Sequence, residues 1–291
     1  TFTTLFSSWN NNMKKVLIIV NTGKKESVAL SVQINDFLQT QKIVSDIINF
    51  DGKKIDVDFS KYSFIVTLGG DGTVLFAARN CAKLKIPVFP INLGEFGFIA
   101  AVQPDEWETS LEEFLQNNSP FVERTMMKLC VQKKNEVVEL YGLNDVVISA
   151  KETARTISLC VEHNNNPLCK IKSDGLIFCT PTGSTAYSAA AGGPIIDPEL
   201  DAFVMTPINA FSLSSRPIVL NSEREIKVKV EPSRTKEICL TVDGQKLIDL
   251  CEGDVIKISR YEQKVKLICV THKTFINALR SKLNWSGVPH A

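Results

Sequence analysis

Short apolar runs separated by polar stretches form the main pattern of this sequence, and their character changes near residue 118. Before that point, four continuous β-rich runs predict buried strands at residues 15–20, 45–50, 64–68 and 87–92. Apolar positions at helical spacing predict helices at residues 26–39, 74–81 and 105–116. Because strands alternate with helices, we expect an α/β domain with a parallel sheet that is covered on both faces.

After residue 118 the β-rich runs become shorter and polar turns separate them. They lie at residues 127–131, 137–141, 156–161, 168–171, 176–179, 226–230, 238–242 and 255–258. This spacing predicts a mainly antiparallel β domain. We therefore divide the chain into an extension outside the fold (1–12), an N-terminal α/β domain (13–118), a β domain (119–272) and a helical end (273–291). We expect the final helix to return to the first domain.

Composition narrows the class of protein. Of the 291 residues, 44% are hydrophobic and 22% are charged, which is typical of a globular protein. With a net charge of +1, the chain lacks the large excess of basic residues that is typical of a nucleic-acid binder. Local phosphate binding remains possible. No apolar run approaches the roughly 18 residues that span a membrane. The eight cysteines are scattered without a metal-binding spacing, so we expect reduced thiols and a cytoplasmic location.

A glycine-rich turn, Gly69-Gly70-Asp71-Gly72-Thr73, follows the third predicted strand and precedes a predicted helix. Glycines let a ligand approach the backbone, and the helix N-terminus favours an anion, so the turn is a candidate phosphate cradle. A carboxylate in such a cradle can accept a proton from an attacking hydroxyl or help to hold Mg²⁺. The alternative is a tight turn in which Asp71 only caps the helix.

A second glycine loop, residues 92–98, follows the next predicted strand. Ligands of parallel sheets gather beyond the carboxyl ends of the strands, where both loops lie. This second loop is as consistent with a simple connection whose glycines relieve strain as with a binding loop.

Residues 174–194 combine hydroxyls, small side chains and glycines in one segment after a strand and before Pro194. Backbone and hydroxyl donors can meet a polar ligand there at short range, and Tyr187 could stack on a base. The alternative is a Ser/Ala-rich helix, starting near Thr185, that packs closely on a neighbouring element.

The pair Asn144-Asp145 stands at the start of a predicted strand, where an amide and a carboxylate suit the two hydroxyls of a ribose. A strand-initiating turn explains the pair almost as well. Asp243-Gly244 predicts a hairpin turn, with Gln245 as a candidate ligand contact.

Isolated charges carry less information. Arg155 and Lys172 are either solvated surface charges or phosphate contacts. The three histidines, His163, His272 and His290, have no spacing that predicts a metal site or a nucleophilic triad, so they are assigned no role.

Taken together, the glycine turn, the 92–98 loop, Asn144-Asp145 and residues 174–194 resemble the NAD kinase family. The resemblance spans residues 16–283. Its most specific part is residues 174–194, whereas the GGDGT motif also occurs in lipid kinases and phosphofructokinases. It implies that ATP, or sometimes polyphosphate, phosphorylates the 2′-hydroxyl of the adenosine ribose of NAD to give NADP. It also implies an α/β domain beside a β-sandwich-like domain, homodimers or homotetramers, and Mg²⁺ or a similar ion with the donor phosphates.

The resemblance also implies roles for particular residues. Asp71 would be the catalytic proton acceptor, and the phosphate cradle would be Gly69, Gly70, Gly72 and Thr73. The implied NAD contacts are Asp71, Gly72, Asn144, Asp145, Arg155, Lys172, Asp174, Thr185, Ala186, Tyr187, Ser188, Ala189, Ala190 and Gln245. The pattern assigns no metal ligand.

Two positions depart from the family pattern. Asp145 stands where a glutamate is usual, which shortens the carboxylate by one methylene and loosens the expected ribose contact. Phe211 stands where many members carry histidine, so no role of that histidine transfers. The competing hypotheses are another GGDGT kinase and a non-catalytic NAD(H) or NADP(H) sensor. Asp71 disfavours a sensor, which has little need of a carboxylate beside a phosphate. The donor, NADH acceptance, feedback by NADPH and the oligomer are left open.

Overall fold

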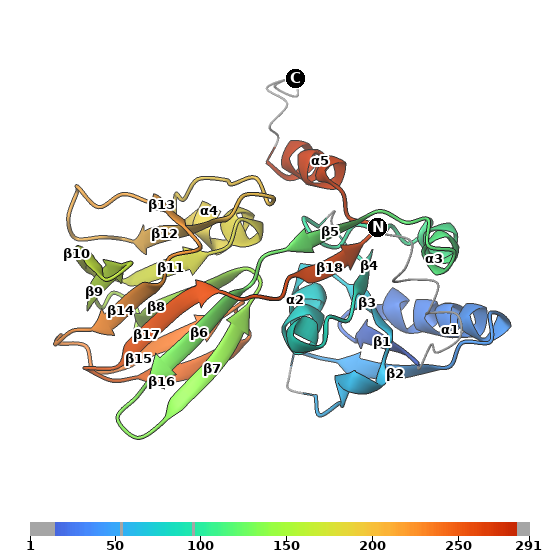
Figure 1. The fold of residues 1–291 in the computed structure, drawn as a ribbon, viewed down its shortest axis with the longest axis horizontal. Helices are drawn as coiled ribbons and strands as arrows, with labels where there is room; N and C mark the ends of the chain where they lie inside the picture. The colour runs from blue at the N-terminus through green and yellow to red at the C-terminus, as the bar shows by residue number, and fades with distance from the viewer. Residues whose placement is uncertain (1–14, 53–54, 95–96, 284–291) are drawn as a thin grey trace. The chain divides into compact units, whose positions relative to one another are not determined.

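The computed structural model describes residues 15–52, 55–94 and 97–283, which form two compact units (Figure 1). Of the described residues, the first unit contains those up to Glu123 and again from Val265, and the second contains residues 124–264. The first unit thus ends at Glu123 rather than near residue 118, and the chain re-enters it at Val265 rather than at Lys273. The predicted extension at residues 1–12 lies outside the described residues.

The first unit is built on a six-stranded sheet in the order β2-β1-β3-β4-β18-β5. The strands are β1 (Val16–Asn21), β2 (Ser45–Phe50), β3 (Phe64–Gly69), β4 (Val88–Asn92), β5 (Phe121–Arg124) and β18 (Val265–Ile268). Strands β2, β1, β3, β4 and β18 pair in parallel, as predicted for the first four. The helices are α1 (Lys25–Thr40), α2 (Asp71–Cys81), α3 (Trp107–Leu115) and α5 (His272–Lys282), with 3-10 turns η1 (Phe59–Lys61) and η2 (Ala82–Leu84).

Both faces of this sheet are covered. Apolar positions of α1 and α3, such as Ile34 and Leu111, pack against alternate residues of β1 and β3, such as Ile18. Residues of the opposite parity, such as Leu17 and Ile65, are also fully buried. Because a covered parallel sheet leaves only its strand ends open, loops at the carboxyl ends are where polar groups can meet a ligand.

Strand β2 corrects the prediction of a buried strand at residues 45–50. Only Phe50 of its six residues is fully buried, where its ring stacks on Phe76 of α2 at 4.3 Å between centroids. The strand lies at the edge of the sheet, so Asp46 remains partly exposed and meets Lys15 at 3.4 Å. A continuous apolar run does not reveal whether a strand will be central or at an edge.

The second unit consists of two six-stranded antiparallel sheets, in the orders β10-β9-β14-β17-β6-β7 and β13-β12-β11-β8-β15-β16. The first contains β6 (Met127–Gln132), β7 (Val137–Gly142), β9 (Ile157–His163), β10 (Asn166–Ser173), β14 (Ile226–Val230) and β17 (Val255–Arg260). The second contains β8 (Asp145–Ala150), β11 (Gly175–Cys179), β12 (Ala202–Ile208), β13 (Ile218–Asn221), β15 (Ile238–Val242) and β16 (Lys246–Leu250). Facing side chains of both sheets form one apolar core, which confirms the predicted mainly antiparallel β domain.

The sequence analysis did not predict four strands: β5, β12, β13 and β18. Strand β12 contains Pro207, a residue that disfavours a central strand, yet β12 pairs with β11 over residues 204–208 and with β13 over residues 202–205. Strand β18 belongs to residues that the sequence assigned to the β domain, yet Leu267 pairs with Val88 of the first sheet. A short β-rich run does not specify its distant partner.

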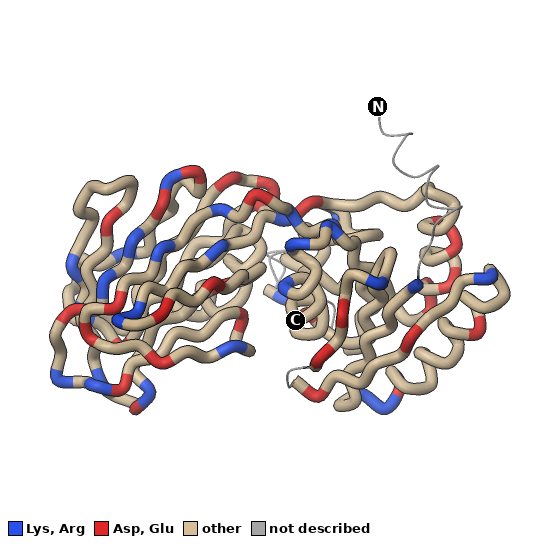
Figure 2. Tube along the Cα trace, turned by 60° about the horizontal axis from the view of Figure 1, so that its bottom comes forward, with Lys and Arg blue, Asp and Glu red and all other residues tan. Residues whose placement is uncertain are grey.

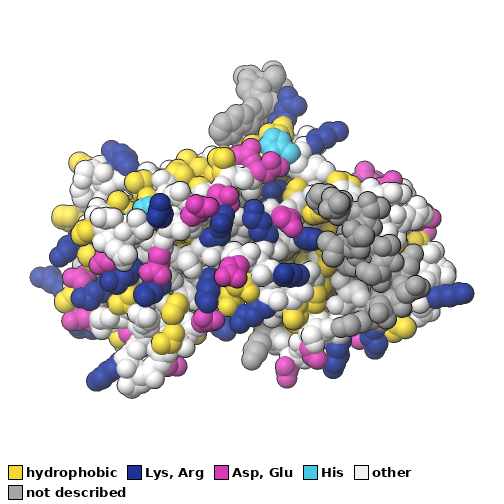
Figure 3. Space-filling view, viewed as in Figure 1, with side chains coloured by type: hydrophobic (Ala, Val, Ile, Leu, Met, Phe, Trp, Pro, Cys, Tyr) yellow, Lys and Arg dark blue, Asp and Glu magenta, His cyan; other side chains and the backbone are white. Residues whose placement is uncertain are grey.

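Charged side chains are distributed over both units. Figure 2 shows lysine and arginine interspersed with aspartate and glutamate along the described trace, and Figure 3 shows the same mixture with small apolar patches on the face it draws. No helix in the described ranges has the length and apolar character that crossing a membrane requires.

Candidate active site

Asp71 is the first residue of α2, and Gly70 occupies the N-cap position without a capping side chain. The Asp71 carboxylate reaches across to the second glycine loop. Its Oδ2 accepts the N–H of Phe98 at 3.1 Å, and its Oδ1 accepts the N–H groups of Ile99 and Ala100 at 3.3 and 3.0 Å. The structure therefore shows no capping bond from Asp71 to its own helix; this carboxylate ties the two glycine loops together instead.

These hydrogen bonds fix the orientation of the Asp71 carboxylate and leave one of its acceptor positions open. An ionised carboxylate offers about four acceptor positions, and three of them are filled by the backbone donors. Among the described residues no group fills the remaining position, on Oδ2. A substrate hydroxyl placed there would meet a fixed oxygen that is ready to accept its proton.

Gly97 makes this arrangement sterically feasible. A Cβ at Gly97 would collide with Oδ1 of Asp71. Position 97 of the loop at residues 92–98 thus requires glycine, because the Asp71 carboxylate occupies the space that a side chain would take. Residues 95 and 96 of the predicted loop lie outside the described residues.

The glycine turn has one crowded and one open position. A Cβ on Gly69 would strike the side chain of Thr73 and lie 3.0 Å from Cβ of Asn21, whereas a Cβ on Gly70 would meet nothing within 4 Å. Thr73 is buried, and its Oγ1 has no partner in the described chain. The exposed part of the predicted phosphate cradle is therefore the backbone at Gly70 and Gly72, at the positive end of α2.

Lys24 is a residue of this region that the sequence prediction missed. It follows β1 in an exposed turn, and its Nζ lies 3.4 Å from the position that a Cβ on Gly94 would take. The ammonium group thus stands beside the second glycine loop, at the carboxyl edge of the parallel sheet. The sequence Gly23-Lys24-Lys25 after the first strand was the available pattern, because short Gly/Lys turns after a strand suit phosphates.

In the second unit, Asp243 organises the Asn144-Asp145 pair. Its carboxylate accepts the N–H groups of Leu143, Asn144 and Asp145 at 3.1, 2.8 and 3.1 Å. Asp243 and Gly244 have φ values of 49° and 65°, which confirms the predicted hairpin turn between β15 and β16. The sequence showed the turn but not this second use of Asp243, which depends on a contact about one hundred residues away.

The 180–184 segment holds the same pair from the other side. Thr180 donates its hydroxyl to the carbonyl of Leu143 at 2.5 Å, and its N–H to the carbonyl of Asn144 at 2.9 Å. A Cβ on Gly183 would overlap the backbone of Asn144. Within the described part of the chain, the side-chain amide of Asn144 makes no hydrogen bond, so it is available to a ligand.

Asp145 is 6% exposed, and its carboxyl group receives no hydrogen bond from the described residues. Burial, together with the negative charge of Asp243, raises the pKa of Asp145 to about 7. Near neutral pH this carboxyl therefore exists in both forms. It can donate a hydrogen bond when protonated and accept one when ionised.

The predicted binding segment folds as a 3-10 turn, η3 (Thr182–Thr185), and one helical turn, α4 (Tyr187–Ala190). Tyr187 is 49% exposed, so its ring is open to a planar ligand. Ser188 is fully buried, and its hydroxyl bonds the hydroxyl of Thr206 at 2.8 Å. The other positions, Thr185, Ala186, Ala189 and Ala190, are partly or fully exposed.

The remaining predicted contacts are dispersed over the second unit. Asp174 accepts a hydrogen bond from Nδ2 of Asn209 at 3.0 Å, and Gln245 lies in the Asp243 turn. Nζ of Lys172 lies 5.2 Å from the ring centroid of Phe211, a ring that is 77% exposed.

Arg155 is exposed and pairs with Glu152 at 3.1 Å. Arg155 and Lys172 line the same pocket. None of the other predicted NAD contacts is among the residues that line it.

A parallel sheet with a glycine-rich turn and a fixed carboxylate at its carboxyl edge is typical of phosphotransferases that bind nucleotides. The comparisons with known proteins agree. Family models described as the ATP-NAD kinase N-terminal and C-terminal domains match residues 55–119 and 143–270. The chain belongs to the NAD kinase family.

Individual relatives cover nearly the whole chain. An NAD kinase of Treponema denticola is 45% identical over 277 residues, which are 94% of this chain and 98% of the relative. An NAD kinase of Geobacter sp. strain M21 is 34% identical, over 94% of this chain and 99% of its own length.

Solved structures show the same fold. Yeast NADH kinase complexed with NADH has a TM-score of 0.84 at 23% identity, over 95% of this chain and 89% of its own. An NAD kinase from Archaeoglobus fulgidus in complex with ATP has a TM-score of 0.75 at 26% identity, over 94% of this chain and 100% of its own.

Proposed function

We propose that this chain transfers the terminal phosphoryl group of ATP to the 2′-hydroxyl of the adenosine ribose of NAD, giving NADP. Membership of the family supports the transfer to NAD, and a relative solved with ATP supports the donor. The single observation that carries the mechanism is the Asp71 carboxylate, which three backbone donors hold in place while one acceptor position on Oδ2 stays open.

In this mechanism Asp71 accepts the proton of the attacking hydroxyl as the new O–P bond forms and the bond to the leaving diphosphate breaks. The backbone at Gly70 and Gly72 and the ammonium group of Lys24 bind phosphate oxygens of the donor. Thr73 and Gly69 support the turn by packing beneath it. Because phosphoryl transfer requires little covalent chemistry from the protein, positioning and charge neutralisation dominate.

NAD binding is assigned to the second unit. Asn144 and Asp145 bind ribose hydroxyls, Tyr187 stacks on a flat ring, and the exposed groups of residues 185–190 line the ligand. Asp174, Gln245, Arg155 and Lys172 complete the proposed set. Asp243 is added as the residue that orients Asn144 and Asp145.

A divalent ion, most simply Mg²⁺, fits this site when it binds together with the phosphates of ATP. Among the described residues no group of three or more His, Cys, Asp or Glu side chains could hold a metal. Mg²⁺ needs no such group, because it keeps several waters and binds substrate phosphates with one or two carboxylates. When bound, it would neutralise charge on the phosphates. Asp71 is the carboxylate that we place beside the phosphate cradle.

The test of the reaction is the formation of NADP from NAD, ATP and Mg²⁺, detected by a dehydrogenase specific for NADP. The position of the new phosphate is read by ³¹P NMR, which separates the 2′ from the 3′ ester. We expect the 2′ ester. Tight NAD binding without consumption of ATP or inorganic polyphosphate would instead favour the sensor hypothesis.

The cellular and quaternary context is also a proposal. Eight free cysteines, most of them buried or half-buried, support a cytoplasmic location. A homodimer or homotetramer is proposed by analogy with the family and is tested by light scattering at micromolar concentration. A single mass near 32.3 kDa would contradict it.

A further inference from the structure

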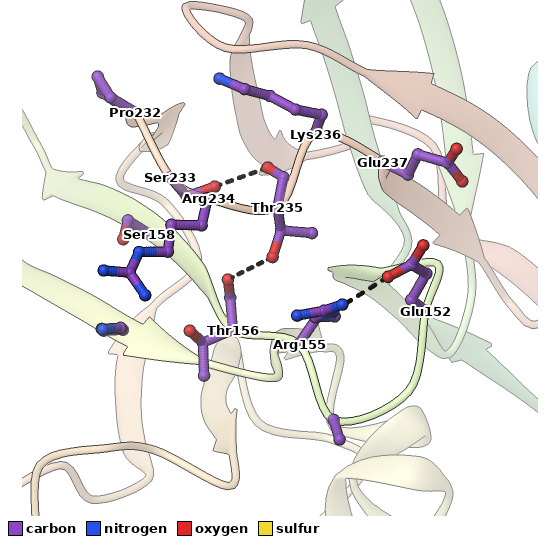
Figure 4. A pocket seen from close by; sticks show the side chains of 12 residues that line it. Glu152, Arg155, Thr156, Ser158, Pro232, Ser233, Arg234, Thr235, Lys236 and Glu237 are labelled. Atoms are coloured by element: carbon purple, nitrogen blue, oxygen red, sulfur yellow. Dashed lines mark hydrogen bonds and ion pairs between the residues drawn. The ribbon is translucent and has the colours of Figure 1, made fainter.

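A separate polar pocket lies in the second unit between the start of β9, the end of β10 and the loop that joins β14 to β15 (Figure 4). Its volume is about 1020 Å³, which is ample for a small ligand. Apart from Arg155 and Lys172, none of the residues assigned above to NAD lines it.

The pocket carries an excess of positive charge. Four basic side chains line it, Arg155, Lys172, Arg234 and Lys236, against the two carboxylates of Glu152 and Glu237. Glu152 is already paired with Arg155 at 3.1 Å. Lys236 pairs at 3.5 Å with Glu252, which does not line the pocket, and this contact between exposed groups is easily exchanged.

Arg234 is a basic group of this lining that forms no ion pair with a described carboxylate. It is exposed, and no carboxylate of the described residues lies within ion-pair distance of it. Figure 4 shows its side chain turned toward the β9 side of the pocket, whereas Glu237 lies on the opposite side. A guanidinium group in this position can form two parallel hydrogen bonds with one phosphate.

The wall that carries Arg234 is fixed in place at both ends. Ser233 donates its hydroxyl to the carbonyl of Thr235 at 2.8 Å, and Thr235 donates its hydroxyl to the carbonyl of Thr156 at 2.9 Å. The N–H of Glu231 bonds the carbonyl of Ser158 at 2.9 Å. These bonds hold the loop against β9, so the pocket is formed before a ligand arrives and little ordering is needed on binding.

The lining also restricts the kind of ligand. No aromatic side chain is among the described residues that line the pocket, and its apolar contributions are limited to Ala154, Pro232 and the stems of the basic side chains. A nucleobase inside this lining would therefore find no ring to stack on, since the exposed ring of Phe211, 5.2 Å from Nζ of Lys172, is not part of it. Hydroxyls of Thr156 and Ser158 stand beside the cations and suit phosphate oxygens.

We propose that this pocket is a second anion site, which binds a short oligophosphate chain without a base and is distinct from the NAD site. Arg234 and Lys236 bind the chain together with Arg155 and Lys172, which this inference moves out of the NAD set. None of its residues is required for proton transfer, so this site should bind anions whether or not the kinase reaction proceeds.

Calorimetric titration of the full chain with inorganic tripolyphosphate tests the site. We expect the double variant Arg234→Ala/Lys236→Ala to lose at least tenfold in affinity. The matched control, Arg224→Ala/Lys246→Ala, removes two exposed cations elsewhere on the second unit and should change the affinity less than twofold. Equal affinity of wild type and the pocket variant would overturn the proposal.

Two further titrations distinguish the ligand and the site. Titration with ATP should show less than a twofold difference between wild type and the pocket variant, because ATP is expected at the glycine turn; an equal tenfold loss would mean that the pocket takes nucleotides. Saturating NAD should leave tripolyphosphate binding unchanged. Displacement by NAD would overturn the second site and return Arg155 and Lys172 to the NAD set.

Discussion

The buried carboxyl of Asp145 leads to a prediction about stability and pH. Its pKa rises from 3.8 to about 7 on folding, because the charged form loses hydration and faces Asp243. A shift of roughly three units corresponds to ~4 kcal/mol of free energy that disfavours the ionised folded state. We predict that Asp145→Asn, whose neutral amide imitates the protonated carboxyl, removes this cost.

The sign follows from proton linkage. Below about pH 4 the carboxyl is protonated in both states and contributes nothing. Between pH 4 and 7 the folded state keeps the proton that the unfolded state releases, so the stability of the wild type falls as the pH rises. Relative to wild type, the variant should therefore gain stability between pH 4.5 and pH 8, by an amount on the order of 2–4 kcal/mol.

Urea unfolding followed by far-ultraviolet circular dichroism at pH 4.5 and pH 8 measures this difference. Other groups titrate over the same range, but they cancel when the variant is compared with wild type at each pH. Asp249→Asn is the matched control, since Asp249 is exposed and forms only a surface ion pair with Lys151. It should change stability by less than about 1 kcal/mol at either pH. If Asp145→Asn shifted stability equally at both pH values, the burial argument would be refuted.

Three further predictions concern the binding groups. Asp243→Ala removes the acceptor of three backbone N–H groups and should cost about 3 kcal/mol in urea unfolding, with loss of NAD binding in calorimetry. Gly183→Ala should destabilise the second unit by about 2 kcal/mol or more in the same unfolding assay, because its Cβ meets the Asn144 backbone; Gly70→Ala, whose Cβ meets open space, should stay within about 0.5 kcal/mol. Tyr187→Ala should raise the KM for NAD at least severalfold while the unfolding midpoint stays the same, since the ring is half exposed; an unchanged KM would remove Tyr187 from the site.

The sequence predicted strands β1 to β4 and the helices of the first unit, because continuous apolar runs and helical spacing are local patterns. The hairpin at Asp243-Gly244 was equally accessible, since the turn type demands those residues. Strand β18 was not, because its pairing with β4 joins residues far apart in the chain.

The chemistry of the site shows the same division. Asp71 and the glycine turn were visible in the sequence, but the bonds from Asp71 to Phe98, Ile99 and Ala100 were not. Those bonds mean that Asp71→Asn removes more than the base. In Asp71→Asn the amide nitrogen would face at least one backbone N–H, so the variant loses a hydrogen bond as well as a base, at about 1–3 kcal/mol.

The role of Asp71 as proton acceptor is the central claim, and steady-state kinetics of Asp71→Asn beside Ala100→Pro tests it most directly. The proline removes one of the three donors to the carboxylate but leaves the carboxylate itself, so it reports the cost of a loosened loop. We predict that Asp71→Asn loses at least about 10²-fold in kcat while the Kd for NAD changes less than threefold, and that Ala100→Pro keeps at least a tenth of the wild-type kcat. An Asp71→Asn enzyme that also kept a tenth of the wild-type kcat would contradict the mechanism.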